Sequence, residues 1–498
     1  MSLNADVPKR ISVDQLNKYG KKHDIWCMGC GKRLYEMLEI YRDEPFISQI
    51  THFIDNNEML WGQSICIENR YFAISGKDVL NKANGRKTLL LITSDAVVSI
   101  YQSIKKELNE NKVTCYLYPV FYRNITSMFL KLFSHFICNR RLLFYAGDEP
   151  HENADAIVEY LHKEYHGKKF EPVYVGDSFK KTKIGVMQID KLSVRKKSSI
   201  REVLRYCYYY ATSKYLFYEN EALKKVCDKQ VLIYLNHGTI PLKRVCDVLK
   251  QTEELDYGVC PSNGCAAIYT EQYGIPESKQ IYMMPARINY LFQENVPIPW
   301  KRAYEKLILW LPTFRQLAGT TRKDSVSDNP LELIQNDKEW KILDELLGNK
   351  KLHLIIKKHP REKKDFLILD SCPHVDVMTD KDLEENGLLL HQVLAQTDAL
   401  ITDYSGIAFE FMLLNRPIGY VVSDMQMYTR GFAVNNPLDY MPGNKIRHLD
   451  DMLIYIKDVA ESIDRYKAER TKLIKQLFQG NAYENGAKKL IEYIEEKM

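Results

Sequence analysis

Short apolar runs alternate with amphipathic stretches along the chain. Each run has the length of a buried strand, and the stretches between them repeat apolar residues at helical spacing. This pattern favours an α/β fold, in which helices cover parallel strands. The strands we expect are Ile25–Met28, Ile50–Ile54, Leu89–Ile92, Leu142–Tyr145, Pro172–Val175, Tyr215–Tyr218, Val231–Leu235, Gln280–Met283, Lys306–Leu311, His353–Lys357, Val375–Val377, Ala399–Thr402 and Ile418–Val422, followed by a helical tail over Asp450–Lys497.

The expected elements group into three blocks, over residues 1–110, 111–295 and 296–498. The first block has the order of a βαβ series with parallel strands. Pro297 and Pro299 lie among polar residues and predict a linker between the second and third blocks. These two blocks are similar in size, and a cleft between two such lobes is a favoured place for a ligand.

Composition excludes several classes of protein. The 498 residues are 45% hydrophobic and 27% charged, as in ordinary globular chains. The net charge of +5 is too small to indicate a nucleic-acid partner. The eleven cysteines have no repeated spacing, Met1–Arg10 is not a secretory signal, and no apolar run reaches the ~20 residues of a membrane span. We therefore expect a cytoplasmic protein.

One stretch carries the excess positive charge. Between Asn111 and Gly147 there are five basic residues and no acidic one. Inside it, over residues 119–138, apolar and aromatic residues recur at helical spacing. Such a helix can lie on an anionic membrane or pack in the core of the second block, and the pattern fits both. The residues are Phe121, Ile125, Met128, Phe129, Leu132, Phe136 and Ile137, with Arg123, Lys131, Arg140 and Arg141 around them.

The first block contains part of a nucleotide-binding pattern. Gly29 and Gly31 follow the first strand and open a helix, where backbone amides can approach a phosphate. Leu34 stands in place of the third glycine. Asp55 ends the second strand, where a ribose-binding acid would lie. The alternative is a Rossmann-like domain that serves only as a scaffold.

Two histidines follow predicted strands of the later blocks. His237, Gly238 and Thr239 come directly after Val231–Leu235, and His359 follows His353–Lys357. Strand ends of open α/β sheets face the ligand crevice, and histidine can exchange protons near neutral pH. The alternatives are a histidine hydrogen-bonded in a turn and a solvated basic loop.

A third segment resembles an anion site. Thr402 and Asp403 end a strand, and a helix begins near Ser405 and Gly406. Free amides at a helix start attract phosphate, although Ser405 or Asp403 could simply cap the helix. Further candidates follow other strands; they are Thr313 and Arg315, and Asp424 and Arg430.

Taken in order, these motifs resemble the CDP-glycerol glycerophosphotransferase family of teichoic-acid and capsule polymerases and primases. The matching segments are His237–Lys243, Pro312–Arg315, His359–Pro360, Thr402–Ser405 and Asp424–Phe432, with weaker likeness at Asn153–Tyr160 and Pro285–Tyr290. The resemblance covers roughly residues 140 to 480. It implies a GT-B fold, in which two Rossmann-like lobes hold the donor in their cleft, and attachment to the cytoplasmic face of the membrane.

The resemblance also implies roles. His237 would accept the proton of an acceptor hydroxyl, and CMP would leave from CDP-glycerol. The residues implied at the donor phosphates are His359, Arg430, Arg315, Thr313, Thr402, Ser405 and Gly406; the other implied contacts are Gly238, Thr239, Lys243, Asp403 and Asp424. The acceptor would be lipid-linked or a polymer. We expect no protein-held metal and no required cofactor, apart from a nucleotide in the first block.

The chain departs from the family pattern at three places. Asn236 stands where tryptophan is usual, Gly406 where a second serine is frequent, and Asn435–Asn436 where an acid is common. These departures leave the glycerol identity open. The alternatives are a GT-B transferase that uses CDP-ribitol or a nucleotide sugar, and a non-catalytic scaffold that binds a dinucleotide. The first block lies outside the resemblance and keeps only its Rossmann-like fold.

Overall fold

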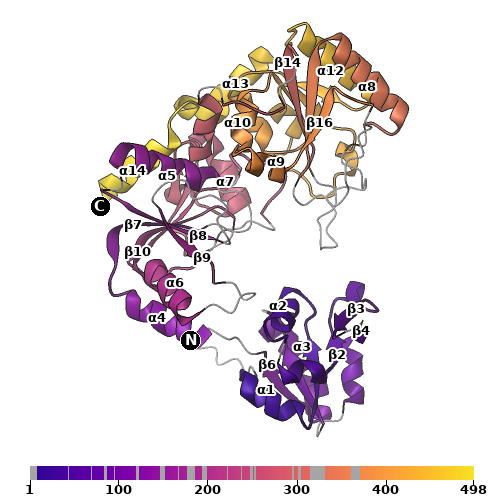
Figure 1. Ribbon diagram of the computed structural model, residues 1–498, viewed down its shortest axis with the longest axis vertical. Helices are drawn as coiled ribbons and strands as arrows, with labels where there is room; N and C mark the ends of the chain where they lie inside the picture. The colour runs from indigo at the N-terminus through magenta and orange to yellow at the C-terminus, as the bar shows by residue number, and fades with distance from the viewer. Residues whose placement is uncertain are drawn as a thin grey trace. The chain divides into compact units, whose positions relative to one another are not determined.

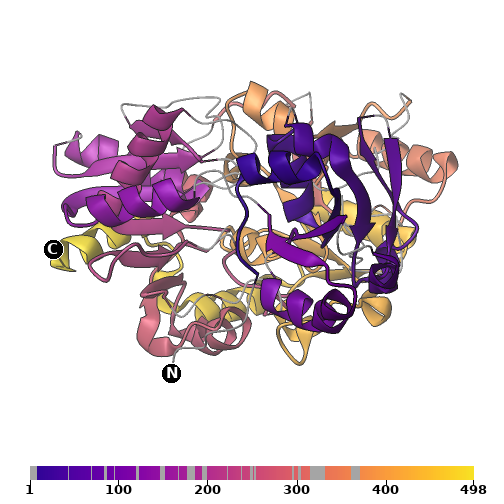
Figure 2. The same ribbon diagram turned by 90° about the horizontal axis from the view of Figure 1, so that it is seen from below.

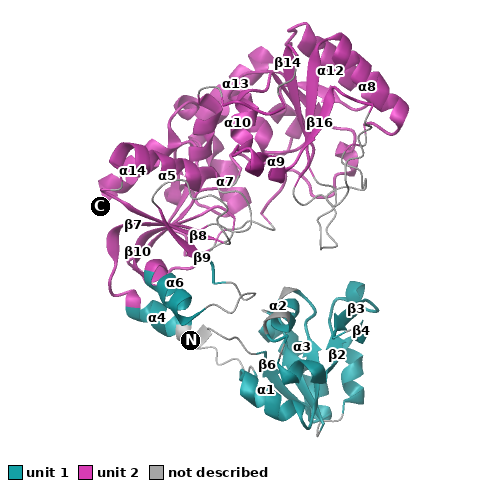
Figure 3. Cartoon of the chain, viewed as in Figure 1, with its two compact units in different colours: residues 1–132, 190–208 teal, residues 133–189, 209–498 magenta. Residues whose placement is uncertain are grey.

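The computed structural model of the chain describes its helices and strands residue by residue (Figure 1). It describes residues 8–42, 44–68, 70–83, 87–94, 96–118, 123–145, 152–166, 168–176, 186–192, 199–220, 223–236, 238–246, 251, 254–293, 296–300, 304–313, 331, 333–359 and 371–497. The chain divides into two compact units (Figure 3). Unit 1 comprises residues 1–132 and 190–208, and unit 2 comprises residues 133–189 and 209–498.

Unit 1 contains a sheet in the order β3-β4-β2-β1-β5-β6. All neighbouring pairs are parallel except the β3–β4 hairpin. Apolar clusters cover both faces of the buried central strands. Its strands are β1 (Asp24–Met28), β2 (Ile50–Ile54), β3 (Ser64–Ile67), β4 (Arg70–Ser75), β5 (Thr88–Ile92) and β6 (Thr114–Leu117), and its helices include α1 (Val13–Gly20), α2 (Lys32–Ile40) and α3 (Val97–Glu110). β6 extends the sheet past residue 110.

The first lobe of unit 2 is built on a sheet in the order β13-β12-β11-β10-β7-β8-β9, with parallel pairing from β13 to β8. Its strands are β7 (Cys138–Tyr145), β8 (Glu171–Gly176), β9 (Met187–Asp190), β10 (Ser213–Tyr218), β11 (Val231–Tyr234), β12 (Tyr257–Cys260) and β13 (Gln280–Tyr282). Its helices are α5 (Glu152–Tyr165) and α7 (Ala266–Tyr273). Two more, α4 (Arg123–Phe133) and α6 (Ile200–Thr212), span the boundary between the units.

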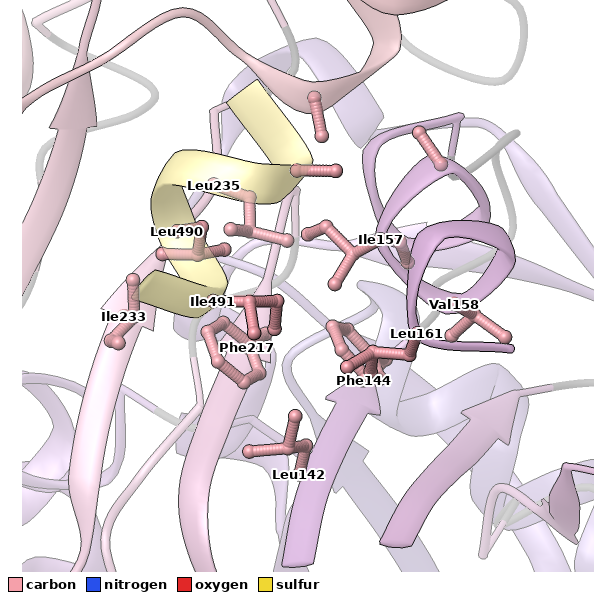
Figure 4. Packing of buried hydrophobic residues seen from close by; sticks show 14 of the residues in the cluster. Leu142, Phe144, Ile157, Val158, Leu161, Phe217, Ile233, Leu235, Leu490 and Ile491 are labelled. Carbon is pink, nitrogen blue, oxygen red and sulfur yellow. The ribbon is translucent and has the colours of Figure 1, made fainter. Parts of the chain in front are cut away.

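The core of this lobe includes the C-terminal end of the chain. Phe144 and Phe217 stack with ring centres 4.8 Å apart. Leu490 and Ile491 of α14 (Gly486–Lys497) pack over them beside α5 (Figure 4). The predicted tail is therefore three helices, α12 (Leu449–Ala460), α13 (Lys467–Phe478) and α14, and the last of them returns to the first lobe.

The second lobe of unit 2 is a fully parallel sheet in the order β16-β15-β14-β17-β18-β19. Helices cover it (Figures 1 and 2), and its central strands are buried except at Lys306, the first residue of β14. Its strands are β14 (Lys306–Leu311), β15 (Leu352–Lys357), β16 (Val375–Met378), β17 (Ala399–Thr402), β18 (Ile418–Val421) and β19 (Asn444–Ile446), and its further helices are α8 (Asp337–Asn349), α9 (Asp380–Glu385), α10 (Leu390–Ala395) and α11 (Ile407–Met412).

Candidate functional site

The predicted donor residues of the second lobe follow the C-terminal ends of its strands. Thr313 follows β14, His359 follows β15, Asp403 follows β17 and Asp424 follows β18. Because the strands are parallel, these positions share one edge of the sheet, where open α/β folds bind ligands. His359 is half-buried there. Arg315 lies outside the described residues.

Two predicted phosphate ligands are instead engaged with the protein. Thr402 is fully buried, and its hydroxyl donates to the carbonyl of Leu311, 2.9 Å away. Thr313 donates to the carboxylate of Asp403 from its amide at 3.0 Å and from its hydroxyl at 2.6 Å. These bonds tie the ends of β14 and β17 together. In this geometry the hydroxyls of Thr402 and Thr313 hold the strand ends, and their contact with the donor phosphates stays a prediction.

Aromatic packing fixes the last motif segment. Tyr404 is buried and its hydroxyl donates to Asp424 at 2.8 Å. The rings of Tyr404, Tyr428 and Phe432 lie 4.6 to 5.4 Å apart. Asp424 thus orients a buried tyrosine, and the cluster holds the chain on both sides of Arg430. The Nε of Arg430 donates to a backbone carbonyl of the first lobe, that of Arg244, at 2.8 Å.

The start of α11 has no side-chain cap. Gly406 is its N-cap, and Ser405 before it is half-buried. Neither Ser405 nor Asp403 therefore caps this helix, although such a cap was the alternative to an anion site. A methyl group added at Gly406 would meet the carbonyl oxygen of Ile240 at 2.8 Å. This approach explains why glycine, and not serine, stands at position 406.

The turn after β11 is built by Asn236. His237 lies outside the described residues, and its neighbours on both sides are described. Asn236 has a φ of 65°, which asparagine tolerates better than most residues. Its side chain accepts from the amide of Gly238 at 3.1 Å and donates to Tyr269. A tryptophan would make neither bond, so the departure at position 236 has a structural reason.

Backbone hydrogen bonds join motif segments of the two lobes. The amide of Arg244 donates to Gly431 at 3.1 Å, and that of Ala433 donates to Leu242 at 2.9 Å. Lys243 and Phe432 form an antiparallel bridge between them. The segment that follows His237 is therefore attached to the segment that carries Arg430, although they are far apart in the sequence.

A buried charge network beside this junction escaped the sequence analysis. Arg287 donates to Glu410 at 2.6 Å and to the carbonyl of Asn236 at 3.0 Å. Glu410 also accepts from the amide of Thr239 at 3.0 Å and contacts His391, which contacts Glu152 on its other side. Thr239, predicted as a ligand contact, is thus buried against Glu410. The signal was present, since Arg287 lies in one of the weaker family segments.

The charges of this network are set by burial and by neighbours. Burial alone would lower the pKa of His391, but the carboxylates of Glu152 and Glu410 outweigh it and raise that pKa to about 9. Burial would raise the pKa of Glu410, yet Arg287 and His391 hold it well below its usual range. Desolvation raises the pKa of Glu219, which is next to this network, to about 8. At neutral pH His391 is therefore an imidazolium between two carboxylates.

The glycine loop of unit 1 is closed by its own acid. Asp55 accepts from the amide of Cys30 at 2.6 Å and from that of Asn57 at 2.8 Å. The amide that would face a phosphate, and the acid that would bind a ribose, are thus bonded to each other. Gly29 has a φ of 99°, while Gly31 is the uncapped N-cap of α2. This arrangement does not support a nucleotide at Gly29, Gly31 and Asp55.

Among the residues that the structure describes, no group of three or more His, Cys, Asp or Glu side chains has an arrangement that could hold a metal ion. Cys27 and Cys30 lie three residues apart, which is the spacing of a C-x-x-C pair. Burial raises the pKa of the Cys30 thiol to about 12, so this side chain is a buried thiol at neutral pH.

Two parallel α/β lobes, joined at their strand ends and by a returning C-terminal helix, define a GT-B fold. The fold is similar to that of a wall teichoic acid polymerase, TagF, with a TM-score of 0.56 at 16% identity over 75% of this chain and 94% of that one. A variant of the same polymerase soaked with CDPG gives a TM-score of 0.57, also at 16% identity, over 75% of this chain and 93% of that one.

The family follows from the sequence profile. Residues 127–496 match the profile of CDP-Glycerol:Poly(glycerophosphate) glycerophosphotransferase, and the chain belongs to this family. It is 25% identical over 301 residues to a teichoic acid poly(ribitol-phosphate) polymerase of Bacillus spizizenii, covering 54% of this chain and 45% of the relative. It is 28% identical over 193 residues to a teichoic acid glycerol-phosphate primase of Bacillus subtilis, covering 38% and 45%. The chain thus spans about half the length of these relatives.

Proposed function

We propose that the chain transfers a polyol phosphate from a CDP-activated donor to an acceptor hydroxyl and releases CMP. CDP-glycerol is the first candidate donor, and a lipid-linked or polymeric precursor of teichoic acid or capsule is the candidate acceptor. The observation that carries the proposal is the junction between the lobes. It brings the segment after His237 beside the segment of Arg430, and both belong to the family's motifs.

The proposed chemistry is an in-line displacement. The acceptor oxygen forms a bond to the β-phosphorus of CDP-glycerol, the bond from that phosphorus to the bridging oxygen breaks, and CMP leaves. His237 takes the hydroxyl proton. His359, Arg430 and Arg315 neutralise the charge that develops on the phosphates, and Ser405 with the Gly406 amide holds the pyrophosphate.

Release of CMP tests this proposal. Purified protein is incubated with CDP-glycerol and a phosphopolyol or lipid acceptor, and CMP is quantified. We expect His237→Ala and His359→Ala each to lower the rate by about 10²–10⁴-fold. The matched control is His374→Ala, since His374 pairs with Asp344 at 3.1 Å and has no place in the proposed site. Near-normal turnover by folded His237→Ala would reject the base assignment.

CDP-ribitol is the second candidate donor. Its support is that a ribitol-phosphate polymerase and a ribitol-phosphate primase, each 25% identical, are among the relatives. Parallel assays with CDP-glycerol, CDP-ribitol and a nucleotide sugar separate the candidates. A donor that binds also raises the melting temperature, which identifies it even where the acceptor is wrong.

We also propose that the chain works on the cytoplasmic face of a membrane. Met128, Leu132 and Phe136 in and just after α4 are 59%, 53% and 67% exposed, with exposed Lys131 and Arg140 nearby. Such a face suits an anionic bilayer better than a protein core. Phe121 lies outside the described residues, and the side chain of Ile125 is not described.

Arg141 does not belong to this face, which corrects the sequence analysis. It is 6% exposed and donates to both carboxylate oxygens of Glu171 at 3.0 Å. No helix in the described part of the chain is long and apolar enough to cross a bilayer.

Vesicle sedimentation tests the membrane proposal. We expect binding to vesicles of anionic lipid, and loss of that binding when Met128, Leu132 and Phe136 are changed to serine together. Ile454→Ser is the control, because Ile454 is also 53% exposed but lies on α12. Equal binding by the triple variant and the control would reject this face as the contact.

A further inference from the structure

His391 lies between two carboxylates that belong to different lobes of unit 2. Its Nδ1 contacts Glu152 at the start of α5, and its Nε2 contacts Glu410 on α11. The residues His391, Glu152 and Glu410 are 4%, 8% and 2% exposed, respectively. The amide of Leu390 also donates to Glu152 at 3.1 Å. One imidazole therefore connects the lobes in a site that is almost closed to water.

The same network holds the turn of the first lobe on both sides of position 237. Glu410 accepts from the amide of Thr239 at 3.0 Å and from its hydroxyl. Arg287 bridges Glu410 and the carbonyl of Asn236. The residues before and after His237 are thus attached to a carboxylate that comes from the second lobe.

We propose that His391 and Glu410 are positioning residues, which fix the two lobes of unit 2 relative to each other and orient the turn that carries position 237. The part that concerns His237 as a base rests on the proposed function. The part that concerns the lobes stands without it.

A purely stabilising role would not require these groups. Well-packed apolar residues can replace a buried ion pair with little loss of stability. Here each polar group makes a directional bond to a backbone or side-chain partner at the junction, and this directionality is what sets a geometry. As an imidazolium, His391 donates from both ring nitrogens at once and so fixes two acceptors. The charged groups that face it are Glu152 and Glu410, with Arg287 and Glu219 behind them.

The test compares His391→Gln and Glu410→Gln with a matched control, His353→Gln. His353 is also buried, at 2% exposure, and its Nε2 lies 2.9 Å from a carboxylate oxygen of Asp376. Unlike His391 and Glu152, however, these two residues belong to the same lobe. The first measurement is CMP release with separate kcat and KM. A displacement of about 1 Å in a catalytic group can lower the rate about 10²-fold, so we expect kcat to fall by that factor in both network variants, with KM for the donor changed less than about threefold.

The second measurement is independent of activity. Spin labels at Lys163 on α5 and Lys341 on α8 report the distance between the lobes. We expect a broader distance distribution in His391→Gln and Glu410→Gln than in the wild type and His353→Gln. If the wild type releases no CMP from either CDP-polyol, the proposed function fails, and this distance measurement alone decides the inference.

Unchanged kcat in folded network variants would overturn the positioning of the turn, and an unchanged distance distribution would overturn the fixing of the lobes. Should these variants not fold, Glu152→Gln replaces them, because it loosens the bridge from the first lobe and leaves Arg287 paired with Glu410. The same two outcomes then apply to Glu152→Gln.

Discussion

In each unit a carboxylate accepts hydrogen bonds from the backbone, but the two carboxylates connect different parts of the chain. Asp55 in unit 1 accepts from the amides of Cys30 and Asn57, which lie in the loops after β1 and β2 of the same sheet. Glu410 in unit 2 accepts a hydrogen bond from the amide of Thr239, which lies 171 residues away in the sequence and in the other lobe. The first closes a loop onto itself, whereas the second connects two lobes around a candidate site. The same kind of acceptor therefore makes a local contact in unit 1 and a contact between lobes in unit 2.

The largest effect is expected when the guanidinium of Arg287 is removed from the network of unit 2. Arg287→Met leaves Glu410 and the carbonyl of Asn236 buried without their main partner. Breaking a buried pair in this way typically destabilises by about 3–5 kcal/mol. Urea unfolding measures the loss. The control is Arg465→Met, since the side chain of Arg465 is 59% exposed beside Asp458 and should contribute about 0–1 kcal/mol. Equal losses in the two variants would mean that the network does not stabilise unit 2.

Buried titratable groups of the network region should also make the stability of unit 2 depend on pH. The pKa of His391 rises from 6.5 to about 9 on folding, so its contribution is complete below pH 6.5 and is lost as the pH rises through 9. The pKa of Glu219 rises from 4.5 to about 8, so its burial reduces stability progressively between those values. Both changes lower stability toward alkaline pH.

Unfolding measured between pH 5 and 9.5 checks this expectation. His391→Gln should flatten the upper part of the decline and Glu219→Gln the lower part. A decline of wild-type slope in both variants would show that other groups cause it.

A smaller loss of stability is expected when Gly406, at the junction between the lobes, is changed to alanine. An added methyl group would meet the Ile240 carbonyl at 2.8 Å, and because φ at Gly406 is −60° the effect is one of space alone. We expect Gly406→Ala to lower the free energy of unfolding by about 1–3 kcal/mol. Gly480→Ala is the control, because a methyl group there meets nothing within 4 Å. If both variants are equally stable, the lobes do not approach as closely in solution.

The sequence predicted most of the sheets because central parallel strands are continuous apolar runs. It missed β12 (Tyr257–Cys260), whose glycine and cysteine are weak strand signals, and β6 (Thr114–Leu117), which is only partly buried. It also missed the β3–β4 hairpin at the edge of unit 1 and the edge strands β9 and β19 of unit 2. These strands depend on neighbours that spacing alone does not reveal.

The sequence predicted which site residues follow the ends of strands. It did not predict which residues those side chains contact. Asp403, Asp424 and His359 lie at the expected edge. The hydroxyl of Thr402 donates to a carbonyl that is 91 residues away in the sequence. The hydroxyl of Thr239 donates to a carboxylate that is 171 residues away. Glu410 lies on the helix that follows the Thr402–Ser405 segment, where its sequence position is that of an ordinary helical residue. Burial and pairing across lobes are tertiary properties, so they became visible only with the fold.

A substitution at Asp55 in unit 1 should change stability least. Asp55→Asn keeps one acceptor oxygen but loses the charge, so one of the two amide bonds weakens and unit 1 should lose about 1 kcal/mol. Asp14→Asn, an exposed acid on α1, is the control. Because the Cys30 amide is already occupied by Asp55, NAD should not raise the melting temperature of the wild type, and CMP release should be the same in both variants. A fall in CMP release at unchanged stability would instead give unit 1 a part in the reaction, and a rise in melting temperature with NAD would restore the nucleotide site.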